Sequence, residues 1–295
     1  MSGDFSNDDP FGSALSAARY YWSLGLEPIP FSSFRQDPRW RWKPPVQWTA
    51  QDIKREFAAI ENVGIALGER SGNLIDVDLI WAEASLIGMA TMEDLPPFGR
   101  RTVRFGHRLA MGRLPNCVVR FKIPDEAAHL FNPEHLTVLE LRGNRHQVMV
   151  PPSIHPSGER LEWELEFDEV PEIDSDQLIR DAGLTAFLAV VARVYPKTPS
   201  HRNDVCLALA GTLLRAGYHP NCADIYIEKL AWVGGDDEFD RRDNTSNEAL
   251  FRHWARDGIG SVSTLCNLLG IEPMTEAFQG WLSSGFQGGS GNGSE

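Results

Sequence analysis

Two aspartates, two residues apart, are the first candidates for chemistry. Asp76 and Asp78 lie at the end of the apolar run of residues 74–78. Side chains alternate along a strand, so both carboxylates point to one side, with their Cα atoms about 7 Å apart. Two converging carboxylates repel each other unless a divalent cation lies between them, and such oxygen ligands suit Mg²⁺ or Mn²⁺. The pair therefore predicts a metal site, of the kind in which two cations align a phosphoryl transfer.

A second carboxylate position lies on another expected strand. Glu140 is flanked by Leu139 and Leu141 and therefore faces the side opposite its apolar neighbours. It could be a third metal ligand, a solvent-facing residue, or the ion-pair partner of Arg142, which faces the same side. An arginine at this place also suits forked contacts with phosphate.

Two histidines and a serine could contact a triphosphate. His107 follows Gly106 in a basic segment, and an imidazole beside arginines suits phosphate, although an ordinary loop histidine fits the same pattern. Residues 151–152 are both proline and end a strand abruptly. Ser153 and His155 then stand in a rigid turn, where a hydroxyl and an imidazole can hydrogen-bond phosphate oxygens.

The basic residues are concentrated, although the net charge of −13 argues at first against a nucleic-acid protein. Residues 95–124 contain no Asp or Glu, and a second basic cluster at residues 35–43 includes Lys43, a further candidate for the triphosphate. This distribution is compatible with weak, non-specific binding of nucleic acid or nucleotide, with a solvated basic face as the alternative. The arginines expected to contact DNA are Arg100, Arg101, Arg104, Arg108 and Arg113.

Composition limits the remaining classes of protein. The chain has 295 residues, of which 42% are hydrophobic, enough for a sizeable core. It contains no apolar run of 18 residues, so we expect no membrane span, and its acidic N-terminus does not resemble a signal peptide, so we expect a cytoplasmic protein. The four cysteines form no Cys-x-x-Cys pair, which argues against structural zinc.

Periodicity predicts an α/β or α+β first half. Helices are expected at residues 12–25 and 50–60, the second with Thr49 as its N-cap. Between and after them, short apolar runs bounded by turn residues predict strands. These strands are expected at residues 27–31, 63–67, 73–78, 102–106, 116–122, 136–142, 146–150 and 160–165.

Beyond residue 182 the apolar period becomes helical, at positions 184, 187, 188 and 191 and onward. We therefore expect a catalytic domain at 1–170, a linker at 171–182, an all-α helical bundle at 183–284 and a flexible tail at 285–295. Three acidic residues at 236–238 could hold a cation or could form a capping turn. No P-loop motif occurs, so any replicative helicase would lie on a longer chain or a separate partner.

These motifs, in this order, resemble the primase-polymerase domain of the archaeo-eukaryotic primase superfamily, in the form found in plasmid, phage and mobile-element replication proteins. The similarity runs over roughly residues 13–165. The segments that carry it are residues 25–30, 43–45, 48–49, 62–68, 71–72, 76–78, 142–143 and 150–158.

The resemblance implies an α+β catalytic domain whose mixed sheet has a part like an RNA-recognition motif, followed by a helical domain. It implies a DNA-templated nucleotidyltransferase that synthesises and extends primers from (deoxy)ribonucleoside triphosphates. Asp76 and Asp78 match the first metal motif, His107 the histidine that contacts the nucleotide phosphates, and Glu140 the third metal carboxylate.

Under this hypothesis, two cations position a 3′-hydroxyl against an α-phosphate, and catalysis is mostly alignment and charge neutralisation. Two alternatives remain open from the sequence. One is a catalytically degenerate replication-initiation or DNA-binding module, which would bind without incorporating nucleotides. The other is a metal-dependent nuclease, which uses the same carboxylates and has no need of a triphosphate pocket.

Overall fold

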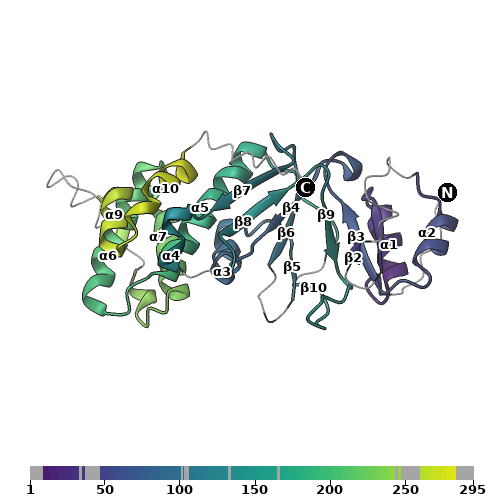
Figure 1. Cartoon of the computed structure of the whole chain (residues 1–295), viewed down its shortest axis with the longest axis horizontal. Helices are drawn as coiled ribbons and strands as arrows, with labels where there is room; N and C mark the ends of the chain where they lie inside the picture. Colours follow the sequence, from purple (N-terminus) through teal and green to yellow (C-terminus); the bar gives the residue numbers. More distant parts are fainter. Residues whose placement is uncertain are drawn as a thin grey trace. The chain divides into compact units, whose positions relative to one another are not determined.

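The computed structural model describes residues 9–32, 35–36, 47–100, 102, 106–131, 134–164, 167–242, 245–246 and 260–283 (Figure 1). The chain forms two compact units, each assembled from three stretches of sequence. Unit 1 comprises Met1–Asp78, Asp94–Val119 and Leu141–Ser175. Unit 2 comprises Leu79–Glu93, Arg120–Glu140 and Asp176–Glu295. Within the described ranges, no helix is both long and apolar enough to span a bilayer.

Unit 1 contains a four-stranded antiparallel sheet of order β2-β1-β3-β9 (Figure 1). Helices α1 and α2 contact each other, and α1 packs against β1 and β3. The second helix begins with a capping box, in which Thr49 and Asp52 satisfy each other's backbone N–H groups, so the predicted N-cap is confirmed. The bounds are α1 Ala14–Ser23, α2 Ala50–Phe57, β1 Pro28–Ser32, β2 Arg35–Gln36, β3 Asn62–Ala66 and β9 Gln147–Val150.

A second sheet has the order β10-β5-β6-β4-β8-β7 and carries the carboxylate pair on its interior strand β4. Strand β4 is apolar except for its two aspartates and is buried over its first four residues. The division between the units falls within β7 and β8. The bounds are β4 Leu74–Asp78, β5 Pro97–Gly99, β6 His107–Met111, β7 Val118–Lys122, β8 Thr137–Arg142 and β10 Glu162–Trp163.

Unit 2 is mainly helical. Helix α5 is buried along nearly its whole length, and α7 packs against both α3 and α6. Gly217, at a φ of 91°, follows α6 and marks the C-terminal end of that helix. The α-helices are α3 Ala82–Thr91, α4 Ala128–Phe131, α5 Ser175–Arg193, α6 Pro199–Arg215, α7 Pro220–Val233, α9 Val262–Leu269 and α10 Thr275–Leu282. Short 3-10 helices are η2 Glu69–Ser71, η4 Asp125–Ala127, η5 Phe239–Arg242 and η6 Glu272–Met274.

The α+β class with a helical second part is confirmed, and seven predicted strands are present as β1, β3, β4, β7, β8, β9 and β10. The expected strand at 102–106 and the tail at 285–295 fall largely or wholly outside the described residues. Helix α5 begins at Ser175, so residues 175–182 of the expected linker are helical. The division into domains at 1–170 and 183–284 stays a prediction.

Candidate metal and nucleotide site

The two aspartates of β4 and the first residue of β6 form a compact cluster. Asp78 is directly opposite His107 in the antiparallel pair, and Asp76 is opposite Leu109. Opposed residues of such a pair lie on the same face of the sheet, so Asp76, Asp78 and His107 share a face. Each offers a ligand atom, and these atoms all lie within 4.8 Å of one another.

Two basic side chains hold the carboxylates. His107 Nδ1 lies 3.1 Å from Asp76 Oδ1 and 3.8 Å from Asp78 Oδ1. Arg142 donates from Nε to Asp76 Oδ2 at 2.9 Å, and its Nη2 contacts both that oxygen and Asp78 Oδ2, the latter at 3.1 Å. Asp76 is fully buried, while the other three side chains are each between a fifth and a quarter exposed. The predicted site residues Asp76, Asp78, His107 and Arg142 are thus brought together.

The charges of this cluster shift one another's pKa values. Burial disfavours the charged form of Asp76, but the positive charges of Arg142 and His107 and their hydrogen bonds outweigh it, so the pKa of Asp76 is lowered. Burial also disfavours protonated His107, but Asp76 and Asp78 outweigh it, so the pKa of His107 is raised. Two carboxylates therefore lie beside a guanidinium and an imidazole whose protonated form they stabilise.

The donor set fits a divalent cation. Carboxylate oxygens suit Mg²⁺ and Mn²⁺, and an imidazole nitrogen beside them fits Mn²⁺ better than Mg²⁺. In the described part of the chain, Asp76, Asp78 and His107 are the group of three side chains whose ligand atoms could hold a metal ion. Glu140, predicted as a third ligand, is outside that group and accepts a hydrogen bond from Arg120 Nε at 2.9 Å. Arg142 occupies the same oxygens that a cation would need, so guanidinium and cation compete.

A family model described as the N-terminal domain of bifunctional DNA primase/polymerases matches residues 17–173. The match covers more than half of the chain and includes the whole cluster described above. The chain belongs to this primase-polymerase family. No curated protein matches it.

In this primase-polymerase, the loop that follows β9 carries two predicted phosphate-binding residues, Ser153 and His155, which have different environments. Ser153 is fully buried, and its hydroxyl donates to Val63 O and accepts from Val63 N, both at 2.8 Å. The hydroxyl therefore ties the loop to β3, which is a structural role that the sequence did not predict. His155 is partly exposed, and its Nδ1 accepts the N–H of Ser157 at 3.1 Å. Burial and the neighbouring Arg100 lower the pKa of His155.

The predicted basic residues are dispersed. Lys43, Arg101 and Arg104 lie outside the described residues. Arg108 is only 2% exposed and donates to Leu95 O at 2.9 Å, and burial lowers the pKa of Arg108 to about 10. Because its guanidinium is so enclosed, Arg108 cannot reach a DNA phosphate. It also lies on the face of β6 opposite His107. We therefore withdraw Arg108 from the predicted DNA contacts.

Two other predicted DNA contacts are accessible. Arg113 is exposed at the start of the turn after β6, and Ser175 Oγ accepts its backbone N–H at 2.9 Å. Arg100 is 27% exposed and lies 3.7 Å from Glu159. These two arginines remain candidates.

The acidic turn after α7 is an ion-pair site. Arg202 donates to Asp236 Oδ1 at 2.8 Å and also to Asp237, while Tyr195 donates to the second oxygen of Asp236 at 3.0 Å. The two aspartates therefore connect the end of α7 with α6 and do not converge on a cation. The sequence left open a cation site and a capping turn at residues 236–238. The contacts of Asp236 and Asp237 support a structural role for this turn.

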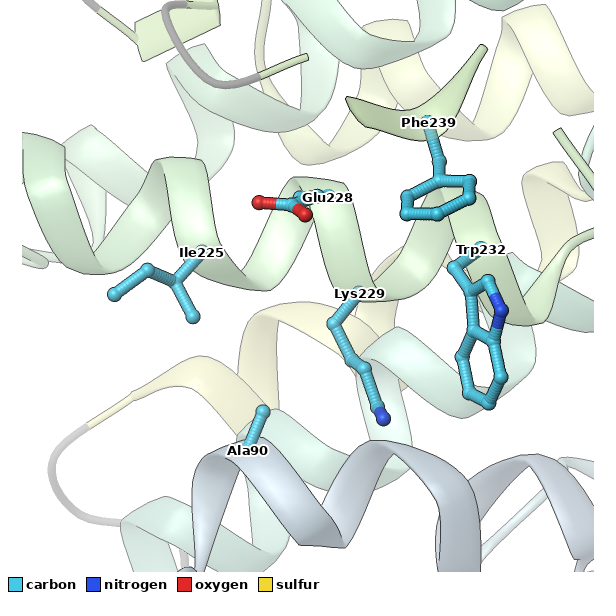
Figure 2. A pocket seen from close by; sticks show the side chains of 6 residues that line it. All are labelled: Ala90, Ile225, Glu228, Lys229, Trp232 and Phe239. Atoms are coloured by element: carbon cyan, nitrogen blue, oxygen red, sulfur yellow. The ribbon is translucent and has the colours of Figure 1, made fainter. Parts of the chain in front are cut away.

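Unit 2 also contains an open apolar hollow with a volume of about 310 Å³. Figure 2 shows side chains of α7 along it, with Ala90 on the neighbouring helix and Phe239 on the far side. Lys229 lies over the ring of Trp232, with Nζ 4.3 Å from the centroid. None of the residues predicted to act in catalysis lines this hollow.

Proposed function

We propose that this chain is a DNA-templated nucleotidyltransferase that synthesises primers and extends them, in the replication of a plasmid, phage or mobile element. The observation that carries the proposal is the gathering of Asp76, Asp78 and His107 within 4.8 Å on one sheet face, with Arg142 beside them. Membership of the primase-polymerase family supports it. The substrates are a single-stranded DNA template and (deoxy)ribonucleoside triphosphates, and the protein acts in the cytoplasm.

In the proposed mechanism Asp76 and Asp78, with Glu140 as a third carboxylate, hold two Mg²⁺ or Mn²⁺ ions. Bound there, the ions supply charge neutralisation and alignment for the attack of a 3′-hydroxyl on an α-phosphate. His107 and Arg142 neutralise the carboxylates, and with cations bound there the same two side chains would be available to the triphosphate. Arg142 suits this role because a guanidinium binds phosphate through paired N–H donors. His155 and Lys43 are further candidates for phosphate contacts.

The decisive experiment is primer synthesis on single-stranded DNA with Mn²⁺, comparing wild type with the double variant Asp76→Ala, Asp78→Ala. We expect the double variant to fall to the background of the assay. The matched control is Asp125→Ala, which removes an exposed carboxylate that pairs only with Lys122 on the surface. Full synthesis by the double variant would refute the assignment.

The same preparation separates the alternatives. If the wild-type protein degrades labelled DNA in the presence of Mn²⁺ without added nucleotides, and the double variant does not, the protein is a nuclease. Binding of DNA with neither synthesis nor degradation would identify a binding module. A primase-polymerase instead binds a nucleoside triphosphate and incorporates it opposite the template.

A further inference from the structure

A row of directly opposed residues crosses four neighbouring strands of the second sheet and ends at the carboxylate pair. Trp163 on β10 is opposite Phe98 on β5, Phe98 is opposite His107 on β6, and His107 is opposite Asp78 on β4. Opposed side chains of antiparallel strands lie on one face and in contact range. We call Trp163, Phe98 and His107 the aromatic row.

The rings of the aromatic row contact one another. Phe98 and His107 are stacked, with centroids 5.1 Å apart and planes at 19°. Trp163 lies on the other side of Phe98, with centroids 4.8 Å apart at 52°. Phe98 is fully buried, so its ring cannot move aside without opening a cavity. The stacked face of Phe98 therefore limits rotation of the imidazole whose Nδ1 lies 3.1 Å from Asp76.

The outer end of the row is fixed as well. Trp163 Nε1–H donates to the hydroxyl of Tyr21 at 3.1 Å, and that hydroxyl donates to Pro151 O at 2.8 Å. Phe167 stacks on Trp163, with centroids 4.0 Å apart and planes at 6°. Burial raises the pKa of Tyr21 well above its ordinary value, so its hydroxyl keeps the proton it donates. Pro151 begins the loop that carries His155, so Tyr21 joins the row to that loop.

We propose that Phe98 and Trp163 are positioning residues for nucleotidyl transfer. They set the plane of the His107 imidazole beside the carboxylate pair, and Tyr21 holds the row and the Pro151 loop in one arrangement. The catalytic consequence rests on the function proposed above. A group displaced by about 1 Å from its productive place can lower a rate by about 100-fold, so a small ring far from the substrate can matter.

The test compares Phe98→Leu with Phe57→Leu. Phe98 and Phe57 belong to the same core cluster and are 0% and 1% exposed, but the ring beside Phe57 is that of Trp48. The same atoms are removed from the same core, so both variants should lower the unfolding midpoint similarly. Only Phe98→Leu should slow primer synthesis, by about 10- to 100-fold. An equal loss of primer synthesis in both variants would show that the aromatic row only packs the core, and it would overturn the proposal.

A double-mutant cycle with His107→Ala shows whether Phe98 acts through the imidazole. We expect Phe98→Leu to cause no further loss when His107 is already alanine, and a full additional loss would overturn the proposal. Mn²⁺ binding without nucleotide is measured for the wild type, the two single variants and the double variant. It should show the same coupling between Phe98 and His107. This second readout needs no synthesis. If the wild type makes no primer, the proposed function fails, and the Mn²⁺ cycle still decides on the row.

Trp163→Phe replaces Phe98→Leu in the cycle if the leucine variant does not fold. It keeps a ring opposite Phe98 and removes the Nε1–H that Tyr21 accepts. We expect a smaller loss, about 3-fold, that again disappears in the His107→Ala background. A loss of equal size in both backgrounds would refute the row.

Discussion

Removing the guanidinium of Arg142 should destabilise the metal-free protein. In Arg142→Gln, the fully buried carboxylate of Asp76 would keep His107 as its basic partner. Removing one partner of a buried ion pair costs about 3–5 kcal/mol. Arg142 is 20% exposed and His107 still offsets part of the charge, so we expect a loss near the lower end, about 2–3 kcal/mol. For a chain of this length, that corresponds to a melting temperature about 3–5 °C lower.

The same substitution should strengthen Mn²⁺ binding. Arg142 contacts oxygens of both Asp76 and Asp78, so its positive charge repels a cation at those oxygens. Two unit charges 4 Å apart interact by about 4 kcal/mol at an effective dielectric constant of 20. Even a third of that, about 1.4 kcal/mol, is a 10-fold change in affinity. Primer synthesis should nevertheless fall, because the variant lacks the proposed phosphate contact.

The assay is thermal unfolding with and without Mn²⁺, together with calorimetric titration of the ion. Arg55→Gln is the control, because Arg55 is 63% exposed and pairs only with acids of its own helix. Its melting temperature should change little, since exposed ion pairs contribute at most about 1 kcal/mol. An Arg142→Gln protein that is as stable as wild type without metal, or that binds Mn²⁺ more weakly, would contradict this account of the site.

Three further outcomes follow from polar groups that are buried or partly buried. Burial raises the pKa of Asp181 from 3.8 to about 6, so the folded state holds a proton that the unfolded state releases, and stability falls as pH rises from about 4 to about 6. In Asp181→Asn, urea titrations across this range should show that loss, about 2–3 kcal/mol, removed. Ser153→Ala should lose about 1–3 kcal/mol in urea unfolding, because both backbone groups of Val63 lose their partner. Arg193→Gln should lose about 1–3 kcal/mol in the same assay, because its two hydrogen bonds to Glu83, at 3.0 and 2.6 Å, are charge-assisted. Wild-type stability of Ser153→Ala or of Arg193→Gln would contradict the stabilising role given to that side chain.

Local pattern was enough to predict the strand that carries the carboxylates. Residues 74–78 are apolar at every position except the two aspartates, so alternation alone places Asp76 and Asp78 on one face. The cap at Thr49 was predictable for the same reason, since Asp52 follows three residues later. These features depend on neighbours within a few residues, which a sequence displays directly.

The partners of the carboxylates depend on cross-strand register, which a sequence does not display. His107 was expected just after a strand, but it opens β6, and β5 has only three residues and begins with proline, too short for any period. The contact of Phe98 with His107 could therefore not be predicted. Helix α3 was missed because its buried face includes Ser85 and Gly88 while Met89 is exposed, which erases the amphipathic period.

In the proposed mechanism, the charge balance of the site lets one set of side chains serve both folding and catalysis. A fully buried carboxylate beside a second one is costly unless positive charge accompanies it, and Arg142 and His107 provide that charge without metal. A cation that takes the same oxygens releases both basic groups from this task. They then stand beside the ion-binding carboxylates, where the phosphates of a nucleotide would bring negative charge. Under this proposal, cation and triphosphate binding would be coupled through Arg142 and His107, and by linkage each should strengthen the other.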